Sequence, residues 1–310
     1  MLNEFQAGDK IRHIVLFRIQ KIGTSSNGSV FARGTVSDNS ATWPFVCFDN
    51  YTVELLRELT GPKAFLTTGT IDVNRYANDG SLQLMVQKVE EPLTTDDLSH
   101  LLPDGSVELK KYEQKLTTLI ESINDQAVSS LLEKVFSGQN YYSFKTNPAA
   151  MTYHHAYLGG LLEHSVDVAE LALSMGERVK NVDMDIIIAG ALLHDIGKLK
   201  EISQDVGFPY TEEGKFVGHI SLGAMMVNEY AAELQPPFKG GKLDELLHII
   251  LSHHGELEKG SPVSCKTKEA FIVHYADELD SIMNQFRQLE GKGWQFNKML
   301  NRGIYAGDID

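Results

Sequence analysis

Seven side chains of the types that bind metal ions follow one another in the second half of this 310-residue chain. They are His164, His194, Asp195, His219, His253, His254 and Asp277. Gaps of about 20 to 35 residues separate successive groups, so each group can lie on a different helix of one bundle. Because the set offers nitrogen and oxygen ligands but no cysteine, it predicts a catalytic Zn, Mn or Fe type site rather than a structural zinc site.

The pair His194-Asp195 indicates what chemistry such a site would do. It follows the apolar run from Ile186 to Leu193, which predicts a buried helix. A buried, unpaired His-Asp pair is costly, and a cation would satisfy it. Asp195 has two carboxylate oxygens and can bridge two ions. Two ions roughly 3.5–4 Å apart would generate a hydroxide nucleophile and clamp phosphoryl oxygens, so we predict a catalytic role for Asp195.

Lys198 lies three residues beyond Asp195, on nearly the same side if the helix continues. We predict that its ammonium reaches a substrate phosphate, as a catalytic and substrate-binding group. The alternative is a solvated lysine just past the helix end.

Each of the other candidate ligands, taken alone, also fits a role that involves no metal ion. His219 follows Gly218 and would suit a helix start, and His253-His254 would suit one packed and one exposed histidine. Asp277 would suit a surface carboxylate, with Asp280 as a competing ligand one turn later. Their common order in one bundle favours the metal site, and nine of the eleven histidines fall between positions 154 and 274.

Composition places the chain among globular proteins. The hydrophobic fraction is 42% and the charged fraction 23%, with no apolar run of membrane-spanning length and no recognisable signal peptide. The two cysteines, Cys47 and Cys265, lie far apart, so we expect no disulfide and a cytoplasmic location.

The net charge of −14 argues at first against a nucleic-acid partner. However, residues 1–91 hold nine Lys/Arg and ten Asp/Glu, whereas the remaining 219 residues hold 19 and 32. Most of the negative charge therefore lies in the part of the chain that is predicted to bind metal ions. Those ions would offset part of the negative charge where a phosphate binds.

The first 91 residues read as a small β domain. Extended runs at 11–22, 30–36 and 42–48 precede a helical pattern at 50–60, and two more strands at 65–73 and 82–89 follow. Three strands, a short helix and two strands is the order of a five-stranded OB-like barrel.

Aromatic and basic side chains make this barrel a candidate binder of single strands, because bases stack on rings while Arg tracks the backbone. The alternative is that most of the rings fill the barrel core. We expect Trp43 and Tyr76 to be exposed and Arg33 to accompany them. The other aromatic and basic candidates are Phe31, Phe45, Phe48, Tyr51, Arg18 and Arg75.

The rest of the chain reads as helices, so the predicted fold is multi-domain: a β barrel followed by an all-α bundle. Helical patterns cover 108–123, 125–136, 148–179, 183–198, 219–234, 243–254 and 267–289. We divide the chain into a barrel at 1–91, a linker with leading helices at 92–147, the metal-binding domain at 148–290 and a tail at 291–310. The tail carries Trp294, Phe296 and Tyr305, and we expect it to pack on a domain or a neighbouring subunit of a homo-oligomer.

These motifs resemble a known family. His164, His194-Asp195 and Asp277 are similar to the H…HD…D signature of the HD phosphohydrolase superfamily, and the added histidines resemble its binuclear branch. The run from His154 to Ser165, with an OB-like domain ahead of it, resembles the YhaM family of bacterial 3′→5′ exoribonucleases over nearly the whole chain. The resemblance to HD-GYP cyclic-dinucleotide phosphodiesterases is poorer. In those enzymes Gly-Tyr-Pro follows a His-His-Glu, whereas here His253-His254-Gly255-Glu256 runs on to Gly260-Ser261-Pro262.

The resemblance implies two divalent ions, for which we predict Mn²⁺, with Fe²⁺, Co²⁺ or Zn²⁺ as alternatives. One ion would have His164, His194, Asp195 and Asp277 as ligands. The second would share Asp195 and add His219, His253 and His254.

His154 and His155 precede the first ligand by nine and ten residues. On a straight helix that is about 13–15 Å of rise, too far for the same ion. A kink at Gly159-Gly160 would bring them near enough to contact the substrate phosphate or base. The alternative is a pair of surface histidines.

The predicted function is therefore a metal-dependent 3′→5′ exoribonuclease that releases nucleoside 5′-monophosphates from single-stranded RNA, with single-stranded DNA as a further substrate. A phosphohydrolase of small or cyclic nucleotides, whose barrel serves only assembly, is the alternative enzyme. A nucleic-acid-binding regulator without catalysis is the third hypothesis, and the complete ligand set argues against it.

Overall fold

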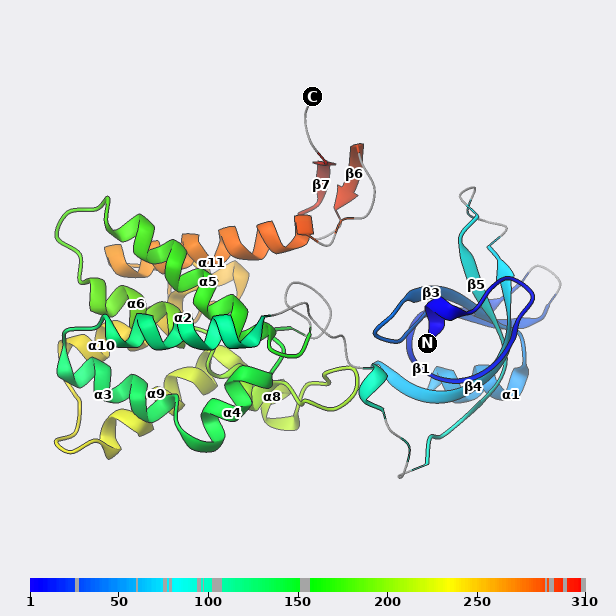
Figure 1. Cartoon of the computed structure of the whole chain (residues 1–310), viewed down its shortest axis with the longest axis horizontal. Coiled ribbons are helices and arrows are strands. Elements are labelled where there is room, and N and C mark those ends of the chain that lie inside the picture. Colours follow the sequence, from blue (N-terminus) through cyan, green and yellow to red (C-terminus); the bar gives the residue numbers. More distant parts are fainter. Residues whose placement is uncertain are drawn as a thin grey trace. The chain divides into compact units, whose positions relative to one another are not determined.

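The computed structural model divides the chain into two compact units. It describes residues 1–25, 28–59, 61–74, 77, 80–93, 96, 98–101, 108–150, 157–287, 289, 293–297 and 300–307. One unit holds Met1–Ser106 together with Ile202–Thr211, and the other holds Val107–Glu201 and Glu212–Asp310 (Figure 1). No helix among the described residues is long and apolar enough to cross a bilayer.

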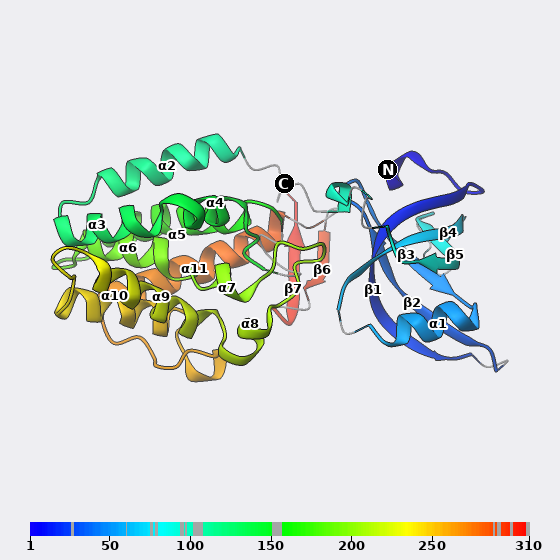
Figure 2. The same cartoon turned by 90° about the horizontal axis from the view of Figure 1, so that it is seen from below.

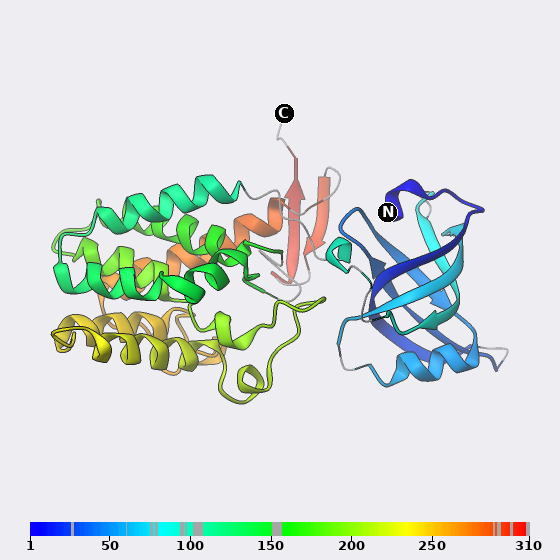
Figure 3. The same ribbon diagram turned by 60° about the horizontal axis from the view of Figure 1, so that its bottom comes forward.

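The first unit is a closed five-stranded barrel, which confirms the predicted OB-like fold. Figure 3 shows this barrel from another side. Its strands follow the order β1-β2-β3-β5-β4, and β3 pairs with β5 in parallel. The elements are β1 (Lys10–Thr24), β2 (Val30–Ser37), β3 (Thr42–Cys47), α1 (Asn50–Arg57), β4 (Lys63–Val73) and β5 (Leu82–Glu90).

The long strand β1 closes the barrel because it pairs with two neighbours. Its first half pairs with β4 and its second half with β2, with an irregularity between Ile19 and Lys21. The backbones approach so closely here that a Cβ on Gly34 would lie 2.0 Å from the Arg18 carbonyl oxygen. Only glycine fits at this position of β2.

Three phenylalanines fill the barrel. Phe17 lies edge-on to Phe45 and Phe65, with ring centroids 4.8 and 5.7 Å apart. The 3₁₀ helix η1 (Leu2–Glu4) adds Leu2, which is fully buried, to the same core. The side chain of Asp38 anchors η1, because its Oδ2 accepts a hydrogen bond from the Leu2 amide at 2.7 Å.

The second unit is a helical bundle, as predicted (Figure 2). The central helix α6 (Met184–Leu193) is apolar on every side and is buried from Ile186 onward. It packs against α5 (Gly160–Gly176), α10 (Gly241–Ser252) and α11 (Lys268–Arg287). The remaining helices are α2 (Leu109–Glu121), α3 (Gln126–Val135), α4 (Gly138–Thr146), α7 (Lys198–Glu201), α8 (Glu212–Val217) and α9 (His219–Glu233), with 3₁₀ turns η2 (Ser99–Leu101) and η3 (Leu257–Lys259).

Several element bounds differ from the prediction. The helix expected at 148–179 begins only at Gly160, after Gly159 adopts a left-handed φ of 82°. The helix expected through Lys198 ends at Leu193, and Lys198 starts the separate turn α7. Helix α4 was not predicted, and the tail contains an unpredicted hairpin of β6 (Gly293–Asn297) and β7 (Arg302–Ala306).

Candidate metal centre

The buried end of α6 places a charged pair inside the bundle. The helix begins at Asp183, whose side chain accepts hydrogen bonds from two first-turn amides, and its apolar run ends at Leu193. His194 and Asp195 follow directly and are 0% and 2% exposed. Such burial is tolerated only if the carboxylate and imidazole have partners, which the surrounding helices supply.

Two imidazoles and a carboxylate meet on one side of Asp195. The Nε2 atoms of His164 and His194 lie 3.2 Å apart, and Asp277 Oδ1 lies 3.3 Å from His164 Nε2. One ligand atom from each of these three residues lies within 4.8 Å of the others. Bonds of about 2.0–2.2 Å to one central ion would produce such spacings, so this group could hold a metal ion.

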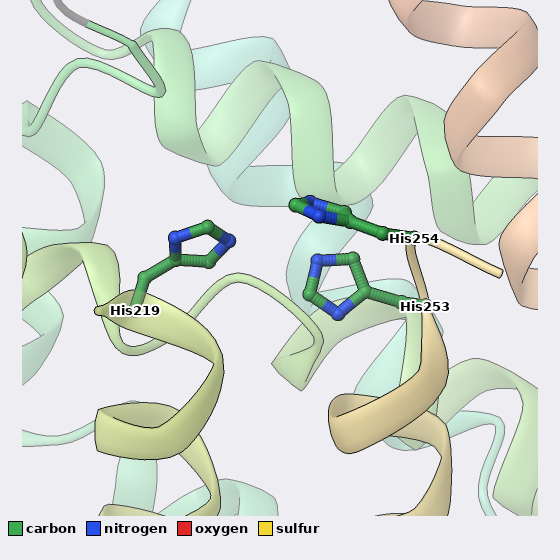
Figure 4. Close-up of side chains that lie close together, drawn as sticks. All are labelled: His219, His253 and His254. Carbon is green, nitrogen blue, oxygen red and sulfur yellow. The ribbon is translucent and has the colours of Figure 1, made fainter. Parts of the chain in front are cut away.

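Three histidines form a second group on the other side. His219 begins α9, whereas His253 and His254 follow the end of α10, and their rings converge (Figure 4). One nitrogen from each lies within 4.8 Å of the others. This group could hold a second ion.

Asp195 lies between the two groups. Its Oδ2 is 3.4 Å from the Nε2 atoms of both His164 and His194. Its Oδ1 is 3.5 Å from His219 Nε2 and 3.7 Å from His253 Nε2. One carboxylate therefore presents a different oxygen to each group.

Three buried atoms, one from Asp195 and two from the second group, have no hydrogen-bond partner among the described residues: Asp195 Oδ1, His219 Nε2 and His253 Nε2. An unpaired buried polar atom is costly, and three that point to one place need a common partner. A divalent cation suits an anionic oxygen and two imidazole nitrogens, so the donor set fits a metal ion.

Main-chain carbonyls fix the tautomers of three histidines. The Nδ1 atoms of His194, His253 and His254 lie 2.7, 2.7 and 3.1 Å from the carbonyl oxygens of Ala191, Ile250 and Lys259. A carbonyl oxygen only accepts, so each Nδ1 carries the hydrogen and donates it. In the neutral ring the lone pair is then on Nε2, the atom directed into the site.

Carboxylates orient the other two histidines. Asp280 Oδ2 lies 2.7 Å from His164 Nδ1, and Glu201 Oε2 lies 3.0 Å from His219 Nδ1. Glu201 also accepts the His219 backbone N–H at 2.9 Å. These acceptors direct both Nε2 atoms inward, as partners of metal-binding histidines do.

The electrostatics keep the carboxylates ionised. Burial alone would raise the pKa of Asp195, but the Lys198 ammonium and the His194 imidazole hold it well below its ordinary value. The pKa of Asp277 is also lowered, because the hydrogen bond from His164 and the charge of His194 outweigh the effect of burial. Burial, together with His194 and His254, holds the pKa of His253 well below normal. The centre therefore presents anionic oxygens and, at His253, a neutral nitrogen.

Lys198 lies inside the centre rather than in solvent. Its residue is 8% exposed, and its Nζ is 2.5 Å from Asp195 Oδ2. Burial alone would lower the pKa of Lys198, but the charge and hydrogen bond of Asp195 raise it above its ordinary value. The ammonium is therefore retained next to the proposed bridging carboxylate.

Sequence reasoning missed two residues of the site and left a third open. Glu201 and His274 were not predicted, and His274 donates from Nδ1 to the His253 carbonyl oxygen at 2.7 Å. Neither has a motif of its own in the sequence. Asp280 had been considered as a competing ligand, and its one-turn spacing from Asp277 was the available signal.

The predicted substrate-binding residues outside the metal centre differ in how exposed they are. Arg33 is exposed and lines a groove of about 650 Å³ together with Phe31 and Phe48. Trp43 was expected to be exposed, but it is partly buried because it packs against the barrel core. Phe45, at 2% exposure, is a core residue. Four candidates lie outside the described residues: Arg75, Tyr76, His154 and His155.

A helical bundle with this arrangement of histidines and aspartates is an HD domain, and the HD domain family matches residues 161–282. The 3'-5' exoribonuclease YhaM of Listeria monocytogenes serotype 4b (strain CLIP80459) is 30% identical over 322 residues, covering 98% of this chain and 97% of the relative. YhaM of the 1/2a strain EGD-e matches equally well, and that of Listeria innocua is 29% identical over 320 residues. The chain belongs to the YhaM family. It is thus a hydrolase of the nuclease and phosphohydrolase class.

A solved structure of RecG bound to a three-way DNA junction also matches, at 18% identity and a TM-score of 0.24. It covers 57% of this chain and 25% of the RecG chain. A likeness of this size carries no argument about fold or function.

Proposed function

We propose that this protein is a metal-dependent 3′→5′ exoribonuclease that releases nucleoside 5′-monophosphates from single-stranded RNA and also accepts single-stranded DNA. The observation that carries the proposal is the convergence of Asp195 Oδ1, His219 Nε2 and His253 Nε2, all buried and without a hydrogen-bond partner in the part of the chain that the structure describes. The names of the YhaM relatives support the direction and the RNA substrate.

We assign the ligands of two ions from the donor set. His164, His194, Asp195 and Asp277 would hold one ion, and Asp195, His219, His253 and His254 the other. When bound, two divalent cations supply a nucleophile at neutral pH and neutralise charge on phosphoryl oxygens. We propose Mn²⁺ first, because the two carboxylates suit it; the imidazoles suit Fe²⁺ and Zn²⁺, which with Co²⁺ are the alternatives.

The protein's own groups prepare this chemistry. The carbonyl and carboxylate acceptors at Nδ1 hold all five rings with Nε2 inward, so little reorganisation is needed when a ligand bond forms. Lys198 holds a buried positive charge beside Asp195. We propose that this ammonium stabilises the negative charge that grows on a phosphoryl oxygen in the transition state.

We propose that the barrel binds the RNA strand through its groove. Arg33 offers a cation for the backbone, and Phe48, whose residue is 50% exposed, offers a ring for a base. The chain after residue 91 holds 19 Lys/Arg against 32 Asp/Glu, whereas residues 1–91 hold nine against ten, so we expect the barrel to supply most of the affinity for the strand.

The decisive experiment uses single-stranded RNA labelled at its 5′ end, incubated with the protein and Mn²⁺. A ladder that shortens from the 3′ end, with 5′-monophosphates as the released product, is the expected result. Free small and cyclic nucleotides are assayed in parallel. Turnover of those compounds alone would favour the alternative phosphohydrolase, and strand binding without any turnover would favour a regulator.

A further inference from the structure

The outward face of α11 is apolar along most of its length. Phe271, Tyr275, Leu279 and Met283 are 46%, 53%, 42% and 43% exposed, and they recur every four residues on one side of the helix. The opposite side carries Asp277, which belongs to the first metal-binding group, and Asp280, which contacts Nδ1 on the far side of His164. Between Phe271 and Met283, these four are the exposed residues of α11, and all four are apolar. We call them the α11 stripe.

The α11 stripe has an internal asymmetry. Its first half is aromatic, and the rings of Phe271 and Tyr275 stack with centroids 6.4 Å apart and planes at 19°. Its second half is aliphatic, with Leu279 and the flexible thioether of Met283. An antiparallel copy of the same helix would place each aromatic half against an aliphatic half.

The tail hairpin carries a second group of exposed apolar side chains. Trp294, Phe296 and Tyr305 are 78%, 66% and 39% exposed, whereas Ile304 and Ala306 are buried. The hairpin follows the C-terminal end of α11 (Figure 1). A two-stranded hairpin is marginal in water by itself, and three exposed rings on it indicate a surface that another molecule covers.

We propose that the α11 stripe is a two-fold interface with a second copy of this chain. In the antiparallel arrangement Phe271 faces Met283 of the second copy, and Tyr275 faces Leu279. The sulfur–aromatic contact and the opposed helix dipoles both favour this pairing. A two-fold interface uses the same patch twice, which the complementary halves of the stripe allow.

The charges favour a second copy over nucleic acid. The ionised residue beside the middle of the stripe is Glu278, and Lys259 Nζ neutralises it at 2.7 Å. A nucleic acid would need cations that offset its phosphates. Two copies of a chain with a net charge of −14 repel each other, so they need a contact surface that carries no net charge.

The area is also sufficient. Aromatic side chains bury about 150–250 Å² each, so the exposed parts of the stripe and of the three hairpin residues together offer on the order of 700–800 Å². A stable interface of standard size buries about 800 Å² per partner. The stripe alone would fall short, so we propose that the hairpin, which follows the Met283 end of α11 in the chain, also contributes to the interface.

The test is a charge exchange across the proposed pairing, read as mass by analytical ultracentrifugation of the full-length protein. Phe271→Lys and Met283→Glu should each raise the dissociation constant of the dimer by about 100-fold or more, because each buries a lone charge. The double variant should recover most of the affinity, since each new lysine then meets a new glutamate of the partner. Circular dichroism confirms that every variant is folded.

The matched control is Val179→Glu, which introduces the same charge on the same unit at a residue that is 39% exposed. It should leave the mass unchanged. A monomeric wild-type chain at micromolar concentration, or single variants that associate normally, would overturn the interface. A double variant that stays dissociated would overturn the antiparallel pairing. If the wild type is monomeric and the single variants lose RNA affinity, nucleic acid covers the stripe instead.

Discussion

Asp195 and Lys198 form a buried ion pair in which Lys198 Nζ contacts Oδ2 at 2.5 Å, while Oδ1 of the same carboxylate has no hydrogen-bond partner within the described ranges of the chain. The two oxygens thus differ in their surroundings. Oδ2 is shared between the ammonium and the imidazoles of the first group, whereas Oδ1 faces the second group. The proposed bridging role and the proposed role of the lysine both follow from this asymmetry.

Asp195→Ala should abolish binding of both ions, because both groups depend on this carboxylate. His219→Ala should lose mainly one ion, because it contributes to one group only. Metal content per chain, measured by mass spectrometry of the purified proteins, checks both outcomes.

Removal of Asp195 also leaves the Lys198 ammonium buried without its partner, which costs about 3–5 kcal/mol. The thermal midpoint must therefore be measured, and Asp195→Asn serves as a variant of the same shape. Asp244→Ala, at an exposed position of α10, is the control. A single ion per wild-type chain that is indifferent to His219 would refute the two-ion proposal.

Lys198→Ala should retain both ions and the fold but lose about 10²-fold or more in turnover, because a charge-stabilising donor has been removed. Arginine should restore little activity, since its planar guanidinium is larger and directed differently. The measurement is kcat and KM on RNA, with Lys200→Ala, an exposed lysine two residues away, as the control. Near-normal turnover would mean that Lys198 only balances the charge of Asp195.

Glu201→Ala should weaken one metal site selectively. Without the Glu201 carboxylate, the His219 ring loses its acceptor at Nδ1, and affinity for the second ion should fall about 10- to 100-fold. Glu201→Gln retains an acceptor oxygen and should lose less. Titration of the metal-free protein with Mn²⁺ by calorimetry checks this; equal weakening of both sites would show that Glu201 acts on the fold as a whole.

Arg33→Ala and Phe48→Ala should weaken RNA binding while hydrolysis of bis-p-nitrophenyl phosphate continues at its normal rate. Loss of one stacked base costs about 1–3 kcal/mol, which corresponds to about 5- to 150-fold in affinity. Leu93→Ala, at a residue that is 69% exposed and does not line the groove, is the control. Point variants are preferable to deletion of residues 1–91, because Ile202–Thr211 clusters with the barrel and Phe208 is only 1% exposed.

Asp38 should make barrel stability depend on acid pH. Burial alone would raise its pKa, but hydrogen bonds from Ser40, from the Leu2 amide and from His13 lower it below the ordinary value. A carboxyl with a lowered folded pKa stabilises the fold above its unfolded pKa, and this contribution disappears as pH falls through the folded pKa. Thermal unfolding at neutral and acid pH should show that Asp38→Ala is destabilised at neutral pH, by about 1.5–3 kcal/mol, with a smaller difference in acid.

The matched control for this series is Asp9→Ala, which removes an exposed carboxylate that accepts one hydrogen bond from the Gln6 amide. Its effect should be smaller at neutral pH. A difference between Asp38→Ala and wild type that is constant across the pH range would show that Asp38 contributes no pH-dependent stability.

The sequence by itself determined the element types and the ligand types. Alternation and turn residues predicted five strands and a helix in the order found, because the periodicity of burial is a local property of each segment. The apolar run of α6 predicted that His194 and Asp195 would be buried, and burial of such a pair implies a cation. Where the local signal was weak, as at α4 and the β6–β7 hairpin, the prediction failed.

Only the tertiary structure decided how the side chains divide around Asp195. Spacing along the chain leaves the distance between helices undetermined, so it could not assign Asp277 to the centre and Asp280 to the far side of His164. The packing of α11 against α5, which carries His164, determines both positions. Glu201 reaches His219 across 18 residues because α7 packs against α9, and no local pattern encodes that contact.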